Sequence, residues 1–318
     1  MKLVFKEIKD NEELDRLLEE VISDIPKNPA IEMAYPDVFY PSFLLSNFNV
    51  RDDSKTIAAF KNRQLVGLAS FIWSRQTFLP PGFLNRIFFI LRLRKAKDIE
   101  DQLIEKVESA YLKLKVPEIS YIRINPIDRL SPTGRRLGKQ GYRKKFSMQR
   151  MARVLNNIPK LETELTSSLR RVKWEEQDLI LFMKTWAKGF GWPAKYIKPV
   201  AEGMTKRLLE RNPTDPNTWI NFLVEIEGQP VGTAAFLTFP ESAYVANVST
   251  LKKFRKRGIA THAMISLMDW CRRQGMKYVA LDVDSDESAA LNLYRKLDFI
   301  EFGESAGYVK KFNFKCKR

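Results

Sequence analysis

The segment from Ala243 to Met264 has the residue types of an anion-binding turn. A run of β-forming residues leads into a basic turn, and the turn leads into an amphipathic helix. Unpaired backbone N–H groups and the helix dipole both favour an anion at such a helix start. Gly258 lets the main chain approach the anion closely, while Arg255, Lys256 and Arg257 add positive charge. The segment therefore indicates a phosphate site; a helix start beside a solvated charge run is the plainer alternative.

Residues 218–312 resemble the core of the GNAT-type N-acetyltransferase superfamily on two motifs at matching spacing. The superfamily's phosphate turn reads R/Q-x-x-G-x-G/A, and a later helix reads A-x-x-x-Y-x-x-x-G-F. The matching residues are Arg255, Gly258 and Ala260 in the turn and Ala290, Tyr294 and Phe299 in the helix. Gly275 and the strand Tyr278–Val283 lie between the two motifs, so the order of elements also matches.

The resemblance implies acetyl-CoA as the cofactor, bound by backbone groups. Amides of the basic turn and of the first helical turn would hold the pyrophosphate, and these belong to Arg255, Lys256, Arg257, Gly258, Ile259, Ala260 and Thr261. Main-chain groups near Thr250 and Lys252 would hold the pantetheine between the strands Ala243–Leu251 and Tyr278–Val283. An amide close to Asn247–Thr250, where Val248 lies, would polarise the thioester carbonyl, as an oxyanion hole made without side chains.

The resemblance also implies the reaction and its acid. An amine attacks the acetyl thioester directly, with no covalent enzyme intermediate and no metal. Tyr294 would protonate the departing thiolate, a suitable role for a phenol with an ordinary pKa of about 10; a tyrosine packed on the sheet is the alternative. Glu287 stands where the superfamily usually has an asparagine that binds pantetheine, and Asp298 stands where it has a glycine. The strand Ala243–Leu251 has no acid, and only Glu241 at its start, or Glu225 and Glu227 in the preceding hairpin, could serve as a general base through water. The only histidine, His262, is interpreted as a helix residue, and no base is assigned.

The composition excludes several other kinds of chemistry. One histidine and two cysteines cannot form a four-ligand Cys/His zinc site or a disulfide framework. The apolar run 87–91 is far shorter than the roughly 20 residues that span a bilayer. The N-terminal residues are too charged for a secretory signal, so the chain is expected to be cytoplasmic. A formal net charge of +16, spread over both halves, predicts an anionic partner beside a small-molecule or protein amine acceptor.

The same order of predicted secondary-structure elements occurs twice along the 318 residues, a length typical of two domains. Each half contains a predicted hairpin, helix, strand, short helical segment and closing β-like stretch. The hairpins are 56–73 and 219–237, the helices 98–114 and 259–273, the strands 119–124 and 278–283, and the closing stretches 143–155 and 299–312. The sequence therefore predicts an α+β fold of two tandem GNAT-like domains, 1–155 and 156–318, each with a mixed, bent sheet flanked by helices.

The first domain is predicted to be a degenerate copy. Its turn has Lys97 at the position of Gly258, and a long side chain there would block close approach of a ligand to the backbone. Leu137 stands at the position of Tyr294. The 1–155 domain therefore lacks both the predicted donor turn and the predicted acid.

The acceptor is expected to meet the segment Trp186–Tyr196 and a final hairpin at Phe302–Tyr308. Three classes of function remain open. The first is an acetyl-CoA-dependent N-acetyltransferase. The second is a tandem-domain acyl or aminoacyl transferase with another donor, such as one carried by RNA, which +16 would help to bind. The third is a non-catalytic module that binds coenzyme A or RNA.

Overall fold

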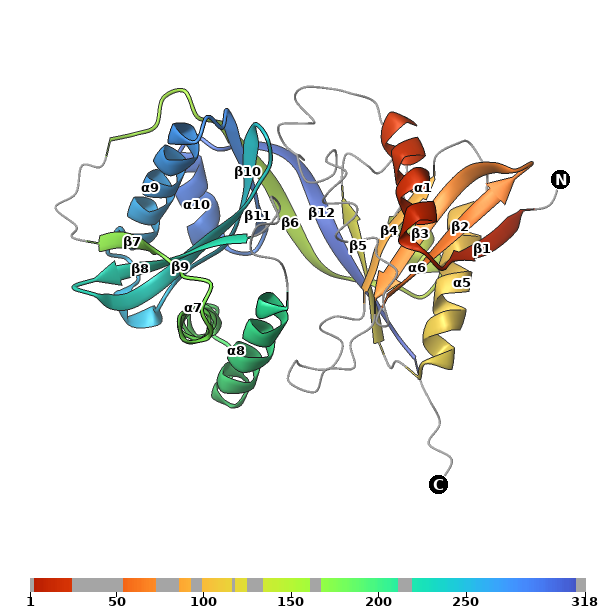
Figure 1. Cartoon of the computed structure of the whole chain (residues 1–318), viewed down its shortest axis with the longest axis horizontal. Coiled ribbons are helices and arrows are strands. Elements are labelled where there is room, and N and C mark those ends of the chain that lie inside the picture. Colours follow the sequence, from red (N-terminus) through yellow and green to blue (C-terminus); the bar gives the residue numbers. More distant parts are fainter. Residues whose placement is uncertain are drawn as a thin grey trace.

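The computed structural model describes residues 3–24, 54–72, 86–92, 99–115, 118–124, 134–160, 167–210 and 219–312. Within these ranges twelve strands form one mixed sheet, in the order β1-β2-β3-β4-β5-β12-β6-β11-β10-β9-β8-β7. Helices cover the sheet at both ends, so the molecule has two lobes (Figure 1). The structure confirms the α+β class and the tandem arrangement expected from the repeated pattern.

The first lobe is built around α5, which packs on β3 and β4. Its elements are β1 (Val4–Ile8), α1 (Asn11–Asp24), β2 (Ser54–Lys61), β3 (Gln64–Ile72), β4 (Arg86–Arg92), α5 (Ile99–Lys113), β5 (Glu118–Ile124) and α6 (Gly134–Lys139). Apolar residues recur every three or four positions along α5, and Leu103, Val107 and Tyr111 are buried against Phe71 of β3. Leu137 is buried in the same core. The predicted degenerate turn around Lys97 lies outside the described residues.

The second lobe buries both faces of its part of the sheet. Its elements are β7 (Ser167–Arg171), α7 (Glu176–Gly189), α8 (Ala194–Leu209), β8 (Trp219–Ile226), β9 (Gln229–Thr238), β10 (Ser242–Thr250), the short helix η2 (Lys252–Phe254), α9 (Ile259–Arg273), β11 (Tyr278–Asp284) and α10 (Ser288–Lys296). Alternate residues of the strands face opposite layers. Phe222 of β8 belongs to the core under α9 and α10, whereas its neighbour Leu223 packs with α7 and α8.

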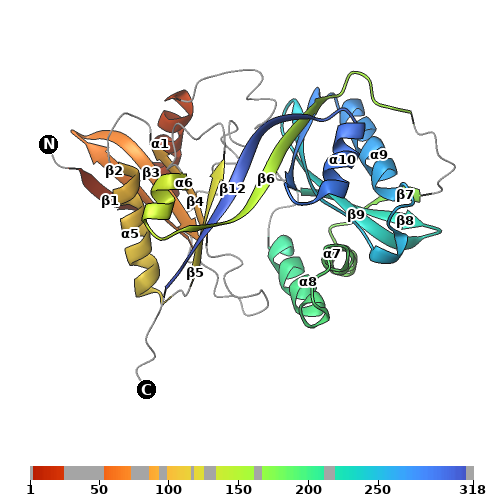
Figure 2. The ribbon, with the colours of Figure 1, turned by 180° about the vertical axis from the view of Figure 1, so that it is seen from behind.

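The two lobes exchange their closing strands. The first half ends in β6 (Arg143–Val154), which pairs with β11 of the second half over seven positions, from Tyr278↔Val154 to Asp284↔Met148. The second half ends in β12 (Ile300–Lys311), which pairs with β5 of the first half and with β6. Both strands run from one lobe to the other (Figures 1 and 2). The predicted limits 1–155 and 156–318 stay a prediction, since strand pairing crosses them.

One expectation about this region is wrong. The final hairpin predicted at Phe302–Tyr308 is part of the single continuous strand β12. Its residues pair with β6 on one side and with β5 on the other, so hydrogen bonds are available along both edges. A strand with two such partners has no reason to fold back on itself.

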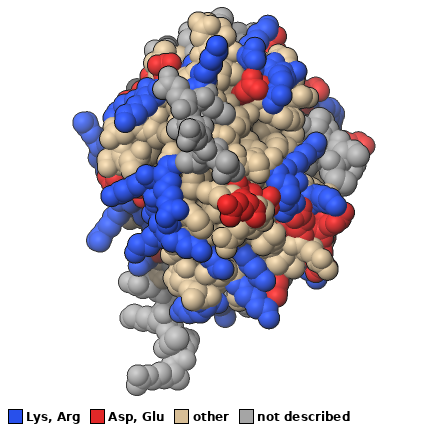
Figure 3. Space-filling view, turned by 90° about the vertical axis from the view of Figure 1, so that its left-hand side faces the viewer, with Lys and Arg blue, Asp and Glu red and all other residues tan. Residues whose placement is uncertain are grey.

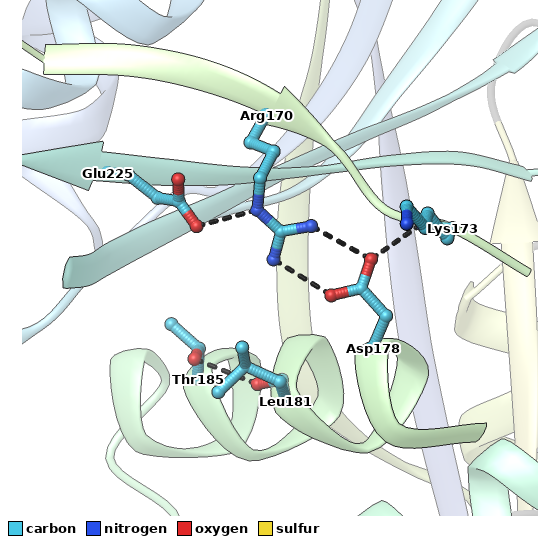
Figure 4. Close-up of polar contacts among 6 residues, drawn as sticks. All are labelled: Arg170, Lys173, Asp178, Leu181, Thr185 and Glu225. Carbon is cyan, nitrogen blue, oxygen red and sulfur yellow. Dashed lines mark hydrogen bonds and ion pairs between the residues drawn. The ribbon is translucent and has the colours of Figure 1, made fainter. Parts of the chain in front are cut away.

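A charged cluster fixes the start of α7 against the sheet (Figure 4). Arg170 of β7 donates to Glu225 of β8 at 2.8 Å and grips both carboxylate oxygens of Asp178 of α7, at 2.8 and 2.9 Å. The backbone N–H of Lys173 also donates to Asp178, at 2.6 Å. These bonds, led by those from Arg170, lower the pKa of Asp178. The cluster therefore sets the position of the helix whose far end reaches β10.

Replacing Asp178 with asparagine is expected to destabilise the protein by about 1–2 kcal/mol at neutral pH, because it breaks a half-buried bidentate pair whose Arg170 is partly screened by water. The folded-state pKa is lowered, so this stability is present above the ordinary value of 3.8 and is lost as pH falls through the lowered value. Urea unfolding of wild type and variant should therefore differ at neutral pH and converge in strong acid. Asp269→Asn, which removes exposed ion pairs with Arg272 and Arg273, is the control and should cost only a few tenths of a kcal/mol.

Candidate active site

The second lobe contains a fork between two parallel strands. β10 and β11 pair from Ser242↔Tyr278 to Val245↔Leu281, and their pairing ends there. β10 then continues beside β9 as far as Thr250↔Gly232. The backbone edges beyond Val245 and Leu281 are thus turned toward the gap, where they could pair with an extended ligand. The fork lies between the strands Ala243–Leu251 and Tyr278–Val283, where the resemblance to the superfamily would place the pantetheine.

A β-bulge interrupts β10 at the fork. The register with β9 shifts between Ala246 and Ser249, and Asn247 adopts a positive φ of 53°. The hydroxyl of Thr233 donates to the carbonyl of Asn247 at 2.7 Å and lies 2.8 Å from the hydroxyl of Ser249. The bulge thus takes Val248 out of the regular ladder with β9.

Two glycines allow neighbouring backbone to reach the bulge. A Cβ on Gly232 of β9 would collide with the carbonyl oxygen of Ser249, and a Cβ on Gly189 of α7 would collide with its hydroxyl. Only glycine fits at these two positions. The C-terminal end of α7 therefore lies directly against β10 at the bulge.

The basic turn presents a helix start without a side-chain cap. Gly258 is the N-cap of α9 with φ 74°, a left-handed conformation that glycine adopts without strain, and no side chain caps the helix. The first backbone bond within the helix runs from the N–H of His262 to the carbonyl of Gly258 at 2.9 Å. The preceding amides, including those of Ile259, Ala260 and Thr261, face the end of the helix. Lys252, Lys256 and Arg257 are exposed around it.

Arg255 has a structural use that the sequence did not indicate. Its side chain donates to the carbonyl of Thr250 at 3.1 Å and to the carbonyl of Gly189 at 2.8 Å. These bonds tie the turn to the end of β10 and to the C-terminus of α7. Arg255 therefore joins the predicted donor side of the site to the helix on the other face of the sheet.

Tyr294 lies on α10 in the core beneath the fork. It is 8% exposed and its ring lies 5.7 Å from that of Phe299. Burial raises the pKa of Tyr294 to about 12, so the phenol stays protonated at neutral pH. Both the packing role and the acid role are compatible with this position. Glu287 is the exposed N-cap residue of α10 and makes no side-chain cap bond.

The acids and the histidine weighed as bases have other partners or positions. Glu241 pairs with Lys277 at 2.5 Å on the exposed start of β10, Glu225 belongs to the Arg170 cluster, and Glu227 is exposed in the β8–β9 turn. His262 shares a 2.9 Å hydrogen bond with Ser167 of β7, and burial lowers its pKa. These positions leave the general base unassigned, as the sequence analysis did.

One carboxylate at the fork, that of Asp282, was not among the acids that the sequence pointed to. Asp282 of β11 pairs with Arg150 of β6 and with the hydroxyl of Tyr244 of β10. The available signal was the alternation in YVALDVD, where an aspartate sits between two core positions. Its partner Arg150 could not be found from sequence, because the two are 132 residues apart.

The equivalent helix of the first lobe already holds its own acids. Glu100, 1% exposed, and Asp101 lie in the first turn of α5. Arg136 of α6 donates to them at 2.6 and 2.5 Å. A helix start that carries two carboxylates repels a phosphate instead of attracting one. This arrangement supports the prediction of a degenerate first domain on grounds other than Lys97.

A cavity of ≈ 480 Å³ lies away from the fork. It runs between residues 156–160 and the outer face of α9, beside Ile265, Asp269 and Arg273.

Figure 3 shows the end of the molecule formed by the second half, with Lys and Arg side chains over much of it and Asp and Glu in smaller groups. Among the described residues, no helix is long and apolar enough to cross a membrane. In the same ranges, no three His, Cys, Asp or Glu side chains gather as metal ligands would.

Comparisons with known proteins agree with this geometry. Residues 182–299 match the family model described as "Acetyltransferase (GNAT) family". A GCN5-related N-acetyltransferase from Sphaerobacter thermophilus is similar in structure, with a TM-score of 0.67, 16% identity, and coverage of 97% of this chain and 95% of that one. A tandem GNAT protein from the clavulanic acid biosynthesis pathway also has a TM-score of 0.67, at 9% identity and 98% coverage of both chains. No curated protein matches the chain.

The match begins in α7 and ends at Phe299, so it contains the fork, the bulge, the basic turn and Tyr294. The structural similarity extends over both lobes and, at these identities, concerns the fold. The second half of this chain therefore contains a domain of the acetyltransferase (GNAT) family, whose members transfer acyl groups from acyl-CoA.

Proposed function

We propose that this protein is an N-acetyltransferase that binds acetyl-CoA in its second lobe and transfers the acetyl group to an amine. The observation that carries this proposal is the combination of an open strand fork, a bulge at Val248 and an uncapped helix start at Gly258. A pyrophosphate fits the helix start, and an extended pantetheine fits the fork. The first lobe is assigned no donor, because Glu100 and Asp101 stand at its equivalent helix start.

The proposed donor contacts run from residue 261 back to residue 248, from the pyrophosphate to the thioester. Main-chain groups from Arg255 to Thr261 hold the pyrophosphate, and those near Thr250 and Lys252 hold the pantetheine. An amide at Val248 polarises the thioester carbonyl. Glu287, exposed at the start of α10, stands beside the pantetheine where an asparagine is usual.

The reaction needs no enzyme-bound intermediate. The lone pair of a neutral amine attacks the carbonyl carbon, a C–N bond forms and the C–S bond breaks. The amine loses one proton and the thiolate of coenzyme A takes one, so the products are an amide and a thiol. Tyr294 supplies the proton to the sulfur and recovers one from water. The chain's own part is to orient the donor, stabilise the oxyanion and deliver that proton.

A second candidate is an acyl or aminoacyl transfer from a donor carried by RNA, which the net charge of +16 favours. Calorimetry with acetyl-CoA, coenzyme A and a short RNA separates the two. We expect one coenzyme A site per chain, occupied with or without RNA. Two equivalent coenzyme A sites per chain would contradict the assignment, and so would a chain that binds RNA but neither acetyl-CoA nor coenzyme A.

Tyr294→Phe tests the acid directly. The change keeps the ring packed against Phe299 and removes the hydroxyl, so acetyl-CoA affinity should stay within a few-fold while kcat falls by roughly 10²-fold. Steady-state kinetics should show kcat and kcat/KM falling together, because the proton is delivered only in the transition state. Tyr111→Phe, at a tyrosine buried in the core of the first lobe, is the matched control. A normal kcat with a lower Tm would make Tyr294 a core residue.

A further inference from the structure

We propose that Asp282 is the carboxylate that receives the acceptor amine, and that Arg150, from the closing strand of the first half, is its positioning residue. This inference rests on the proposed function, since it concerns the acceptor side of the same fork. It goes beyond it by giving the first half a share in the active site and by naming the class of acceptor as a positively charged amine.

The position of Asp282 follows from strand alternation. Its neighbours Leu281 and Val283 are buried in the core beneath α9 and α10, so the side chain of Asp282 points to the opposite face of the sheet. On that face α7 packs against β8, β9 and β10. Asp282 is also the first residue of β11 beyond the last pair with β10, at Val245↔Leu281. The carboxylate therefore lies where the strands part, on the face opposite the helix that starts at Gly258.

The carboxylate is held from two strands. Arg150, 1% exposed, donates from Nε to Oδ1 at 2.5 Å and from Nη2 to Oδ2 at 2.6 Å. The hydroxyl of Tyr244 on β10 donates to Oδ2 at 3.2 Å, and the guanidinium of Arg150 lies 5.1 Å from the centre of the Tyr244 ring. A planar guanidinium that grips both oxygens fixes the plane of the carboxylate. Arg150 and Tyr244 thus fix the orientation of the Asp282 carboxylate before any ligand binds.

Asp282 retains capacity to accept one more hydrogen bond. A carboxylate has about four lone-pair sites, and in the described part of the chain its partners are the two N–H groups of Arg150 and the hydroxyl of Tyr244. The remaining site is on Oδ1, and the side chain keeps 10% of its surface exposed. Because a guanidinium already shares both oxygens, we assign Asp282 the task of orienting the N–H of the acceptor, and not of removing its proton.

The surroundings favour a cationic acceptor. Asp284 shares the face of Asp282 by alternation, so a second carboxylate lies on that face, where it accepts the backbone N–H of Asp286 at 3.0 Å. Tyr244 and Trp219 meet edge to face with ring centres 6.4 Å apart, and aromatic rings next to carboxylates attract ammonium groups. An amine drawn in as the ammonium ion releases one proton to water before it attacks. Alkylamines and polyamines therefore suit this face better than amines that are neutral at pH 7.

A purely structural ion pair between β6 and β11 would show the same distances, so loss of stability alone does not test the proposal. The discriminating quantity is the KM for the amine, measured together with the affinity for coenzyme A. Spermidine and phenethylamine serve as cationic probes, and aniline serves as the neutral amine. Arg153→Lys is the matched control, because Arg153 is a buried guanidinium on the same strand that faces the other way and bonds Leu297 and Asn157.

We expect Asp282→Asn to bind coenzyme A within about threefold of wild type and to raise the KM for the cationic probes by about tenfold or more, with a smaller fall in kcat. Arg150→Lys keeps the charge but loses the two-point grip, so it should raise the same KM by a smaller factor. Arg153→Lys should lower the Tm and leave the KM unchanged.

An unchanged KM in Asp282→Asn, with coenzyme A still bound, would overturn the inference and leave the proposed function standing. Faster acetylation of aniline than of spermidine, or no acetylation of either cationic probe by wild type that binds coenzyme A, would overturn the cationic class. Failure of wild type to bind coenzyme A would instead remove the proposed function itself.

Discussion

A fragment of residues 160–318 is expected not to fold, whereas residues 140–318 are expected to fold and to bind coenzyme A. The two differ by the strand β6, which supplies the partner of β11 over seven positions. Met151 of β6 and Leu155, the residue that follows the strand, are buried in the core of the second lobe. Removing one large core side chain costs about 2–5 kcal/mol, whereas the free energy of unfolding of a whole domain is only about 5–15 kcal/mol. The loss of the strand is therefore expected to exceed the total stability of the lobe.

Folding of both fragments is measured by circular dichroism and size-exclusion chromatography. Binding of coenzyme A is then measured by calorimetry. The longer fragment is the matched control, because it restores β6 without restoring the first lobe. A folded 160–318 fragment that binds coenzyme A as tightly as the full chain would show that the strand exchange is dispensable. A full-length chain with Met151→Asp should behave like the shorter fragment.

Gly258→Glu is expected to weaken coenzyme A binding by about 100-fold or more. The added Cβ meets open space in the protein, so the substitution does not disturb packing. Its carboxylate instead projects from the N-cap of α9, where a pyrophosphate would lie, and two like charges near 4 Å repel by about 4 kcal/mol at an effective dielectric of 20. Calorimetry with coenzyme A measures the loss.

Backbone strain is the competing cause, because glutamate is also disfavoured at φ 74°. Gly228→Glu separates the two effects. Gly228 has the same φ of 74° and open space around it, but it lies in the β8–β9 turn. Both variants should lose similar stability, and only Gly258→Glu should lose the cofactor. Equal affinities in the two variants would move the donor site away from α9.

Local features of the sequence were sufficient for most elements. The helix predicted at 259–273 is α9 with the same limits, and the strands predicted at 278–283 and 119–124 are β11 and β5 within one residue. Periodicity and the helix-ending Gly275 determine these elements from neighbours in the chain. The positive φ of Gly258 also follows from a local need, since the turn must reverse before α9 begins.

Only the tertiary structure decided which strands pair and which side chains meet across them. Sequence alone treated 143–155 and 299–312 as the closing stretches of their own halves, because a strand's hydrophobic pattern specifies a face and not a partner. The exchange of β6 and β12 places Arg150 opposite Asp282. The packing of α7 against β9 and β10 brings the carbonyl of Gly189 within reach of the guanidinium of Arg255. Such contacts join residues 132 and 66 positions apart, and no local pattern carries that information. The motifs thus predicted the donor side proposed for the site, whereas the proposed acceptor side, to which both halves contribute, follows only from the assembled sheet.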